Sequence, residues 1–590
     1  MKKITEKRLC LIPLAVWFVV IPLIVKEKSY ANPLIQYPWY SPNNTLTDFF
    51  LYYKSLFVTA AGIAMLGILF WQIGKMRNKD ILANRDTRIL IPLLIYVSFV
   101  VLSSLISDYS YFCTHGMPDQ FETVWNLISY VIALFYCYYV VVYQHSEKDI
   151  IFFAFIGAAF VGIICVLQYF KIDIYRMIYA KEGYTFTFEL GTVYGPFYNT
   201  NYVGYYSLLF VPLFVMFSIC YKDLKTRIIS AVLACALLIS MAGADSITAG
   251  YAMLGVAIFG ILFILLKNVG KRKKIWILII AVVGVVFVTC LIMTPRFAAY
   301  LQATDTEKTD LENIFTHDDN VEIDYKGQKI FIQMMQQEDL ITFDLKDQNL
   351  IDISYQYMTS DDFYYYEVLD ERFDKMTLIP AILNSDPVKY GFIVNIGEKD
   401  KNWCFTNQLT DDGTYYYYND MGKLTKLTAE NISPDFAPLV KYSYFASGRG
   451  YIWNKTLAIL KEYLLLGSGA DTYAMIYPNE DYVDKYNNGY GGLIVTKPHS
   501  LYLQIATQTG VLSLLCLLIF YLWYFVSSMR IYFKNRLDNI LAISGFSIML
   551  GTLGYMISAL ANDSTITISP LYWALLGVGI GINSRLKISK

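Results

Sequence analysis

Charged residues are scarce in this chain. Only 16% of its 590 residues are Asp, Glu, Lys or Arg, well below the roughly 25% that is usual in soluble globular domains. Hydrophobic residues make up 56%, and apolar runs of about 20 residues, each long enough to cross a bilayer, recur along the sequence. These features exclude a soluble enzyme and predict a polytopic membrane protein.

Several kinds of site are also missing. The net charge of −1 argues against a nucleic-acid partner, because a basic surface supplies most of the affinity in such complexes. The sequence has no Gly-x-x-x-x-Gly-Lys-Ser/Thr loop, no His-Glu-x-x-His pairing and no Cys-x-x-Cys pairing, so we expect neither a nucleotide cofactor nor a metal. The nine cysteines lie mostly inside apolar runs, which argues against a disulfide framework.

Twelve apolar segments are predicted to span the membrane. They cover residues 9–25, 54–73, 89–107, 123–143, 150–170, 202–221, 228–243, 250–266, 275–293, 500–527, 539–560 and 569–584. Lys and Arg are concentrated in every second loop, for example 75–88 and 267–274. Because positive loops stay on the cytoplasmic side, we expect a multi-pass protein of the cell membrane with both termini cytoplasmic.

One long segment, residues 294–498, breaks this alternation and is predicted to be extracytoplasmic. Its part 305–440 is acidic and rich in Tyr, and it alternates apolar with polar residues as strands do. The predicted fold is an all-α membrane bundle with an inserted extracytoplasmic β-rich domain. The domain boundaries we expect are 1–293 for nine spans, 294–446 for the β-rich insertion, 447–498 for an outer loop and 499–590 for the last three spans.

The outer loop contains a segment with helical spacing, Tyr451–Leu466. Trp453, Leu457 and further leucines recur on one side, whereas Asn454 and Lys455 take the other. This pattern is typical of an amphipathic helix at the membrane interface. A helix packed under the β-rich domain is the alternative.

Arg449 is a candidate site residue because it lies between two glycines where this helix begins. A guanidinium beside the free backbone N–H groups of a helix N-terminus can bind a phosphate or diphosphate. Alternatively, Arg449 only contacts lipid headgroups.

His499 is the second candidate. Lys497, Pro498 and His499 directly precede the tenth span, so we expect His499 on the first turn of that helix, at the outer membrane surface. The helix dipole there disfavours a protonated imidazole, which keeps a nitrogen lone pair available. Tyr502 begins a polar stripe that we expect to face the bundle. The alternative is a histidine that only caps the helix.

The motifs in this region resemble the O-antigen ligase and polymerase superfamily, especially its Gram-positive variants. The resemblance rests on Gly448-Arg449, on Trp453, on 466–471 with Asp471, and on Lys497-Pro-His-Ser followed by Gly510. Residues 195–201, with Asn199 and Asn201, resemble a further family segment, and 562–564 resemble its C-terminal end. Many members carry a second Arg after the seventh span where this chain has Ile247; Lys497, Lys455 or Arg176 could compensate for it.

The resemblance implies a GT-C-like membrane glycosyltransferase that needs no cofactor. Its donor would be a glycan on undecaprenyl diphosphate in the outer leaflet, and its acceptor a hydroxyl of a glycan or lipid. Arg449 and His499 take the catalytic roles. The expected substrate-binding residues are Lys497, Asn199, Asn201, Asp471, Tyr502 and Lys455.

Other functions fit the sequence too. A polymerase and a ligase differ only in their acceptor. A lipid-linked oligosaccharide flippase belongs to another class, but flippases favour charges within the spans and an internal repeat. A non-catalytic protein that binds surface glycan through the β-rich domain is the remaining alternative.

Overall fold

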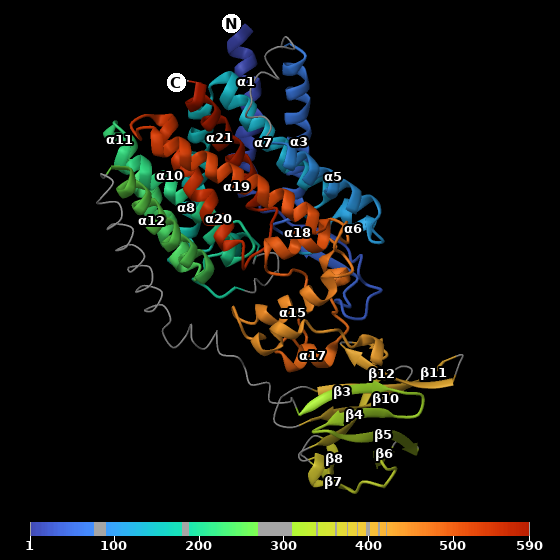
Figure 1. Cartoon of the computed structure of the whole chain (residues 1–590). Coiled ribbons are helices and arrows are strands. Elements are labelled where there is room, and N and C mark those ends of the chain that lie inside the picture. Colours follow the sequence, from blue (N-terminus) through green and yellow to red (C-terminus); the bar gives the residue numbers. More distant parts are fainter. Residues whose placement is uncertain are drawn as a thin grey trace.

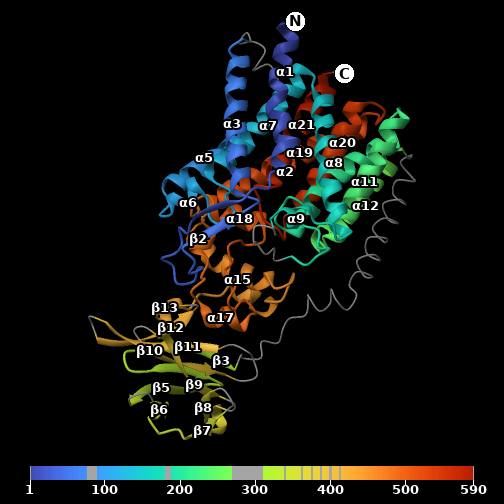
Figure 2. The same cartoon turned by 180° about the vertical axis from the view of Figure 1, so that it is seen from behind.

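A computed structural model describes residues 2–75, 90–179, 188–268, 310–337, 340–359, 363–373, 376–385, 388–396, 402–410, 413–420 and 422–588. Long helices form one end of the molecule, β-sheets form the other, and shorter helices lie between them (Figure 1). Both termini lie at the helical end, far from the sheets, as the view from behind also shows (Figure 2).

The long helices account for the apolar segments. They are α3 (Tyr52–Ile73), α5 (Ile91–Leu105), α7 (Val124–Gln144), α8 (Glu147–Tyr169), α10 (Thr200–Cys220), α11 (Leu224–Gly243), α12 (Ile247–Asn268), α19 (Val511–Lys534), α20 (Ile540–Ser558) and α21 (Ser569–Ile588). The N-terminal segment is helical through α1 (Lys2–Ala15), a π turn at Val16–Val20 and α2 (Ile21–Leu23). Eight of the described helices are long and apolar enough to cross a membrane, which confirms a membrane protein. The predicted ninth span, 275–293, lies outside the described residues.

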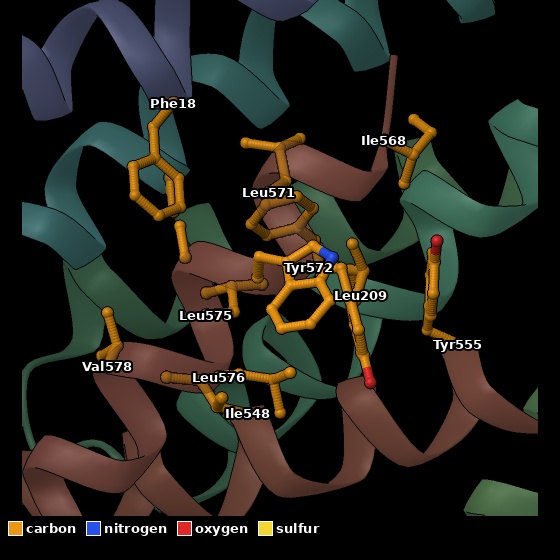
Figure 3. Packing of buried hydrophobic residues seen from close by; sticks show 14 of the residues in the cluster. Phe18, Leu209, Ile548, Tyr555, Ile568, Leu571, Tyr572, Leu575, Leu576 and Val578 are labelled. Atoms are coloured by element: carbon orange, nitrogen blue, oxygen red, sulfur yellow. The ribbon is translucent and has the colours of Figure 1, made fainter. Parts of the chain in front are cut away.

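Helix α21 lies at the centre of the bundle. Its residues 569–584 are almost all buried, as expected for a helix that is apolar on every side. Leu571, Leu575 and Val578 pack there with side chains from several other helices (Figure 3). The indole of Trp17 donates a hydrogen bond of 2.9 Å to the carbonyl of Pro570, so the N-terminal helix is fastened to the last one.

The predicted β-rich segment forms two antiparallel sheets. The first has the order β3 (Leu311–Thr316), β4 (Val321–Tyr325), β5 (Gln328–Gln337), β6 (Leu340–Asp347). The second has the order β13 (Lys423–Thr425), β12 (Gly413–Asp420), β11 (Asn402–Thr410), β10 (Val388–Asn395), β9 (Thr377–Ser385), β8 (Tyr364–Val368), β7 (Tyr355–Thr359). Their inner faces meet where the ring of Phe343 lies 5.2 Å from that of Phe392. The alternating pattern therefore predicted this region correctly.

A small hairpin near the N-terminus was not predicted. Strands β1 (Lys28–Ala31) and β2 (Thr45–Asp48) pair in antiparallel register. The connection between them reaches the β-rich region, since the Lys423 ammonium donates to the carbonyls of Ile35 at 2.9 Å and Tyr37 at 2.7 Å. The β1–β2 connection of the bundle thus contacts the sheets.

The outer helix differs from its prediction. Helix α15 covers Arg449–Leu460, and the predicted polar side is buried, because Asn454 and Lys455 are each only 2% exposed. The helix lies between the bundle and the sheets (Figure 1). This burial agrees with the alternative of a helix packed under the β-rich domain, because acidic residues from other segments neutralise Lys455 inside the protein.

The predicted tenth span is also not one helix. It divides into α18 (Leu501–Thr509) and α19, with Gly510 between them at a φ of +91°. A Cβ atom at Gly510 would lie 2.1 Å from the carbonyl oxygen of Leu465, so only glycine lets that backbone approach. The amide of Val511 donates to the carbonyl of Leu464 at 2.8 Å. The turn at 464–466 therefore occupies the break.

Candidate functional site

A polar cavity of about 430 Å³ lies at the ends of several long helices. Loops from distant parts of the sequence meet there: the β1–β2 connection and the segments before α7, α10, α18 and α21. Its lining consists of Tyr40, Ser41, Leu46, Asp119, Tyr198, Asn199, Asn201, Tyr202, Ile494, Thr496, Lys497, His499, Asn562 and Asp563. Of the predicted site residues, Lys497, His499, Asn199 and Asn201 are brought together in this cavity.

Lys497 supplies a positive charge to the cavity. It is 8% exposed, and its ammonium donates to the hydroxyl of Tyr202 at 3.0 Å. Burial lowers the pKa of Lys497, but the nearby Tyr202 and Asp563 outweigh burial, so the net pKa lies above its usual value. The side chain is therefore cationic and can face an anionic ligand.

His499 is held by a carboxylate. Its Nδ1 lies 3.1 Å from Oδ2 of Asp563, and the other oxygen of Asp563 accepts the amide of Ser500, also at 3.1 Å. A carboxylate only accepts hydrogen bonds, so Nδ1 carries the hydrogen and the lone pair of a neutral ring resides on Nε2. The side chain of His499 is 41% exposed, whereas that of Asp563 is 3% exposed. Asp563 thus orients a reactive nitrogen that ligands can reach.

The position of His499 differs from the prediction in one respect. Ser500 is the N-cap of α18, so His499 precedes the helix instead of lying on its first turn. Its φ of +51° is uncommon for a residue with a side chain. Asp563 stabilises this conformation because it contacts both the ring of His499 and the backbone amide of Ser500.

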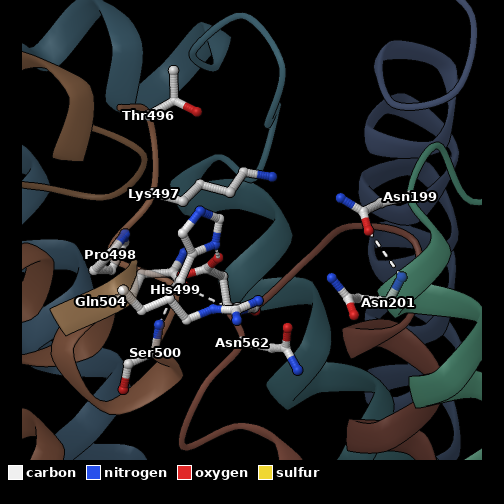
Figure 4. Close-up of polar contacts among 12 residues, drawn as sticks. Asn199, Asn201, Thr496, Lys497, Pro498, His499, Ser500, Gln504 and Asn562 are labelled. Carbon is white, nitrogen blue, oxygen red and sulfur yellow. Dashed lines mark hydrogen bonds and ion pairs between the residues drawn. The ribbon is translucent and has the colours of Figure 1, made fainter. Parts of the chain in front are cut away.

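Asn199 and Asn201 lie across the cavity from Lys497 and His499 (Figure 4). Asn199 caps α10, and its side-chain oxygen accepts the amide of Asn201 at 2.9 Å. The side-chain oxygen of Asn201 accepts the hydroxyl of Ser246 at 3.0 Å. Ile247 follows at the start of α12 with 51% exposure and adds no charge here. The two amides form a neutral, hydrogen-bonding wall.

Arg449 does not line this cavity. It is the first residue of α15, and its Nη1 donates to the carbonyl of Ala446 at 3.0 Å. One turn later, the indole of Trp453 donates to the carbonyl of Pro498 at 2.9 Å. This contact fastens the helix that carries Arg449 to the residue directly before His499.

The other predicted site residues have partners within the protein and do not line the cavity. Lys455 forms ion pairs with Asp435 at 2.8 Å and with Asp484 at 2.7 Å. Asp471 is 1% exposed and accepts the amides of Met117 and Glu122. The hydroxyl of Tyr502 donates to the carbonyl of Met556 at 2.8 Å.

Sequence reasoning missed two acidic residues of the cavity. Asp563 was noted only within the motif 562–564, although an acid in a short loop between two apolar spans is itself a signal of function. Asp119 lies in the loop before α7; loss of hydration beside the cavity wall raises its pKa, an effect that the Lys497 charge opposes. Among the described residues, no group of three or more His, Cys, Asp or Glu could hold a metal ion.

Comparison with known families identifies the segment that carries most of the predicted site residues. Residues 442–518 match the family model described as O-antigen ligase. This segment of the chain is similar to O-antigen ligases. The predicted resemblance is thereby confirmed, and no curated protein sequence matches the chain.

The matched O-antigen ligase segment includes Arg449, Lys497 and His499, together with the break at Gly510. Asn199, Asn201 and Asp563 lie outside it, and the fold brings them to the same cavity. The structure therefore combines membrane-type helices with a segment similar to O-antigen ligases.

Proposed function

We propose that this protein transfers a glycan from undecaprenyl diphosphate to an acceptor hydroxyl at the outer face of the cell membrane, in the assembly of a surface polysaccharide. The observation that carries the proposal is the cavity in which a buried cation, Lys497, and an oriented imidazole, His499, lie side by side (Figure 4). A diphosphate leaving group and an attacking hydroxyl need these two groups.

The proposed reaction uses these two groups as follows. The acceptor hydroxyl attacks the anomeric carbon of the donor, and a new glycosidic C–O bond forms as the bond to the diphosphate oxygen breaks. The hydroxyl proton passes to Nε2 of His499. Asp563 stabilises the resulting imidazolium through Nδ1, and the lipid diphosphate departs with the electron pair of the broken bond.

Lys497 and Arg449 have separate roles in this proposal. Lys497 faces the diphosphate inside the cavity, where a charge is worth more than in water. Arg449, on the helix fastened to Pro498, holds the donor diphosphate with its planar guanidinium. Asn199 and Asn201 hydrogen-bond the sugar hydroxyls from the opposite wall. A substrate-binding role for Lys455, Asp471 and Tyr502 remains a prediction from the resemblance.

A GT-C-like bundle with twelve spans and cytoplasmic termini is part of the same proposal. The β-rich sheets and α15 lie toward the end of the molecule opposite both termini (Figures 1 and 2), and the cavity is lined by residues that directly precede α18, such as Lys497 and His499. An outer-leaflet donor would therefore meet the cavity on the side of the sheets.

The test is the His499→Ala variant in a strain that lacks the chromosomal gene. We expect loss of surface polymer, accumulation of donor in the outer leaflet and normal protein abundance. His499→Gln retains part of the activity if the ring only orients the hydroxyl, and almost none if it takes the proton. His115→Ala is the matched control, because His115 is exposed on α6 (Ser110–His115) and does not line the cavity.

Two outcomes would contradict the proposal. If His499→Ala lowers protein abundance and leaves the activity per molecule unchanged, the residue is only a structural cap. If deletion of the gene traps the donor on the cytoplasmic face, the protein is a flippase.

A further inference from the structure

A further buried carboxylate, Glu122, is connected to the cavity through Ser564, the neighbour of Asp563. Glu122 directly precedes Thr123, the N-cap of α7, and is 4% exposed. Its side chain accepts hydrogen bonds from the hydroxyl of Tyr130 at 2.8 Å and the hydroxyl of Ser564 at 2.7 Å. The side-chain NH2 group of Gln504 donates to the other carboxylate oxygen of Glu122 at 3.4 Å. All three partners are donors, so the ionised form of Glu122 satisfies them together.

These contacts connect the two segments that carry the reactive pair. Ser564 directly follows Asp563, and Gln504 lies on α18, one turn after Ser500. The side-chain oxygen of Gln504 also accepts the amide of Ser564 at 2.8 Å. Glu122, Gln504 and Ser564 thus form a closed triangle that fixes the segment of Asp563 against the helix that follows His499.

The backbone of Glu122 contributes to the same assembly. Its amide donates to Asp471 at 3.1 Å, and Asp471 lies within the O-antigen ligase segment. The residue therefore joins the start of α7, the outer loop, α18 and the loop before α21. A change in the charge of Glu122 acts on all of them.

We propose that Glu122 is a positioning residue whose ionised form aligns Asp563 with His499 and thereby makes glycan transfer pH-dependent. This inference rests on the proposed function. When Glu122 is protonated, one of its oxygens becomes a donor and can no longer accept from Ser564 or Gln504 at full strength. The separation of Asp563 and His499 is then less firmly fixed.

The ionisation of Glu122 falls within the pH range that an activity assay can cover. Burial raises the pKa of Glu122 to about 7, although hydrogen bonds from Ser564 and Tyr130 and the charge of Lys497 act in the opposite direction. Other charged groups that influence it are Asp563 and Asp471. The facing tyrosines of the surrounding helices, Tyr96, Tyr130, Tyr521, Tyr555 and Tyr572, stay neutral below pH 9, since the ordinary pKa of tyrosine is about 10.

The test compares wild type and Glu122→Gln across pH 5.5 to 9, with the full-length protein in liposomes and a lipid-linked donor. Because all other residues, His499 included, are the same in both proteins, the ratio of their kcat values isolates Glu122. We expect a ratio near one at the acidic end that rises to about fivefold above pH 8, roughly the factor between a charge-assisted and a neutral hydrogen bond. The KM for the donor should change little, because Glu122 does not line the cavity.

Matched variants separate the possible results. Glu480→Gln changes another partly buried outer acid, which accepts a hydrogen bond from Asn431, and should give a ratio that does not vary with pH. Ser564→Ala removes one arm of the triangle, leaves the charge in place and should weaken the pH dependence even if Glu122→Gln does not fold.

The outcomes distinguish this inference from the proposed function. If the wild-type protein transfers no glycan, the proposed function fails. If it is active but the ratio for Glu122→Gln is the same at every pH, the positioning role of Glu122 is refuted.

Discussion

Replacement of Asp563 by Asn tests the His499–Asp563 pair most directly. The change preserves the shape of the side chain but leaves only one oxygen to accept hydrogen bonds, where the carboxylate has two. If that oxygen keeps the amide of Ser500, the new NH2 group faces Nδ1 of His499. Nδ1 must then accept, so the ring hydrogen moves to Nε2 and the lone pair that faces the acceptor is lost.

The magnitude follows from the lost interaction. A hydrogen bond to a charged group contributes about 1.5–3 kcal/mol, which corresponds to a loss of roughly ten- to a hundredfold in kcat. Removal of general-base catalysis as well would bring the loss to about 10²–10⁴-fold. A loss in the lower range indicates that His499 mainly orients the acceptor, whereas a larger loss indicates proton abstraction.

The assay measures initial rates of glycan transfer by purified protein in liposomes, normalised to the amount of folded protein. Asp484→Asn is the matched control, because Asp484 pairs with Lys455 and does not line the cavity. The reasoning is refuted if Asp563→Asn keeps kcat within about threefold of wild type while the control behaves in the same way.

Three further results are expected. Arg449→Ala should lower kcat/KM for the donor by about ten- to a hundredfold through loss of one charge-assisted contact, and Arg449→Lys should rescue little of it; normal polymer from a well-expressed Arg449→Ala protein would contradict this role. Lys455→Met should lower the thermal unfolding temperature in detergent, because it leaves two carboxylates without their cation, and should leave kcat per folded molecule unchanged; a selective loss of donor binding would instead support a substrate-binding role. A membrane-impermeant thiol reagent applied to intact cells should label a cysteine at exposed Asn349 but not one at exposed Lys225, relative to the wild-type background; the reverse pattern would invert the proposed topology.

The features that the sequence predicted well depend on local periodicity. Long apolar runs gave helices such as α7 and α10, and the alternation in 321–347 gave β4, β5 and β6. Each of these signals lies within about 20 consecutive residues, so no knowledge of distant contacts is needed. The motif around His499 could be recognised for the same reason.

The failures depend on long-range contacts. The ion pairs of Lys455 were not predicted because its partners, Asp435 and Asp484, lie up to 29 residues away in sequence. Asp563 lies 64 residues from His499, and nothing in the local pattern of either residue indicates that they meet. The break at Gly510 was missed because apolar residues continue on both sides, and only the approach of Leu465 explains why a glycine is required there.

The break at Gly510 also explains why the spacing between His499 and that glycine matters. Gly510 packs against the backbone at 464–466, which fixes one end of α18. The helix has nine residues and rises about 1.5 Å per residue, so it places its other end about 14 Å away. One inserted residue would shift the histidine along the helix axis by about 1.5 Å and rotate it by about 100°. Asp563, held on a different loop, could not follow. The number of residues between Gly510 and His499 therefore fixes the position of the histidine relative to Asp563. We expect substitutions within α18 to be tolerated better than insertions or deletions.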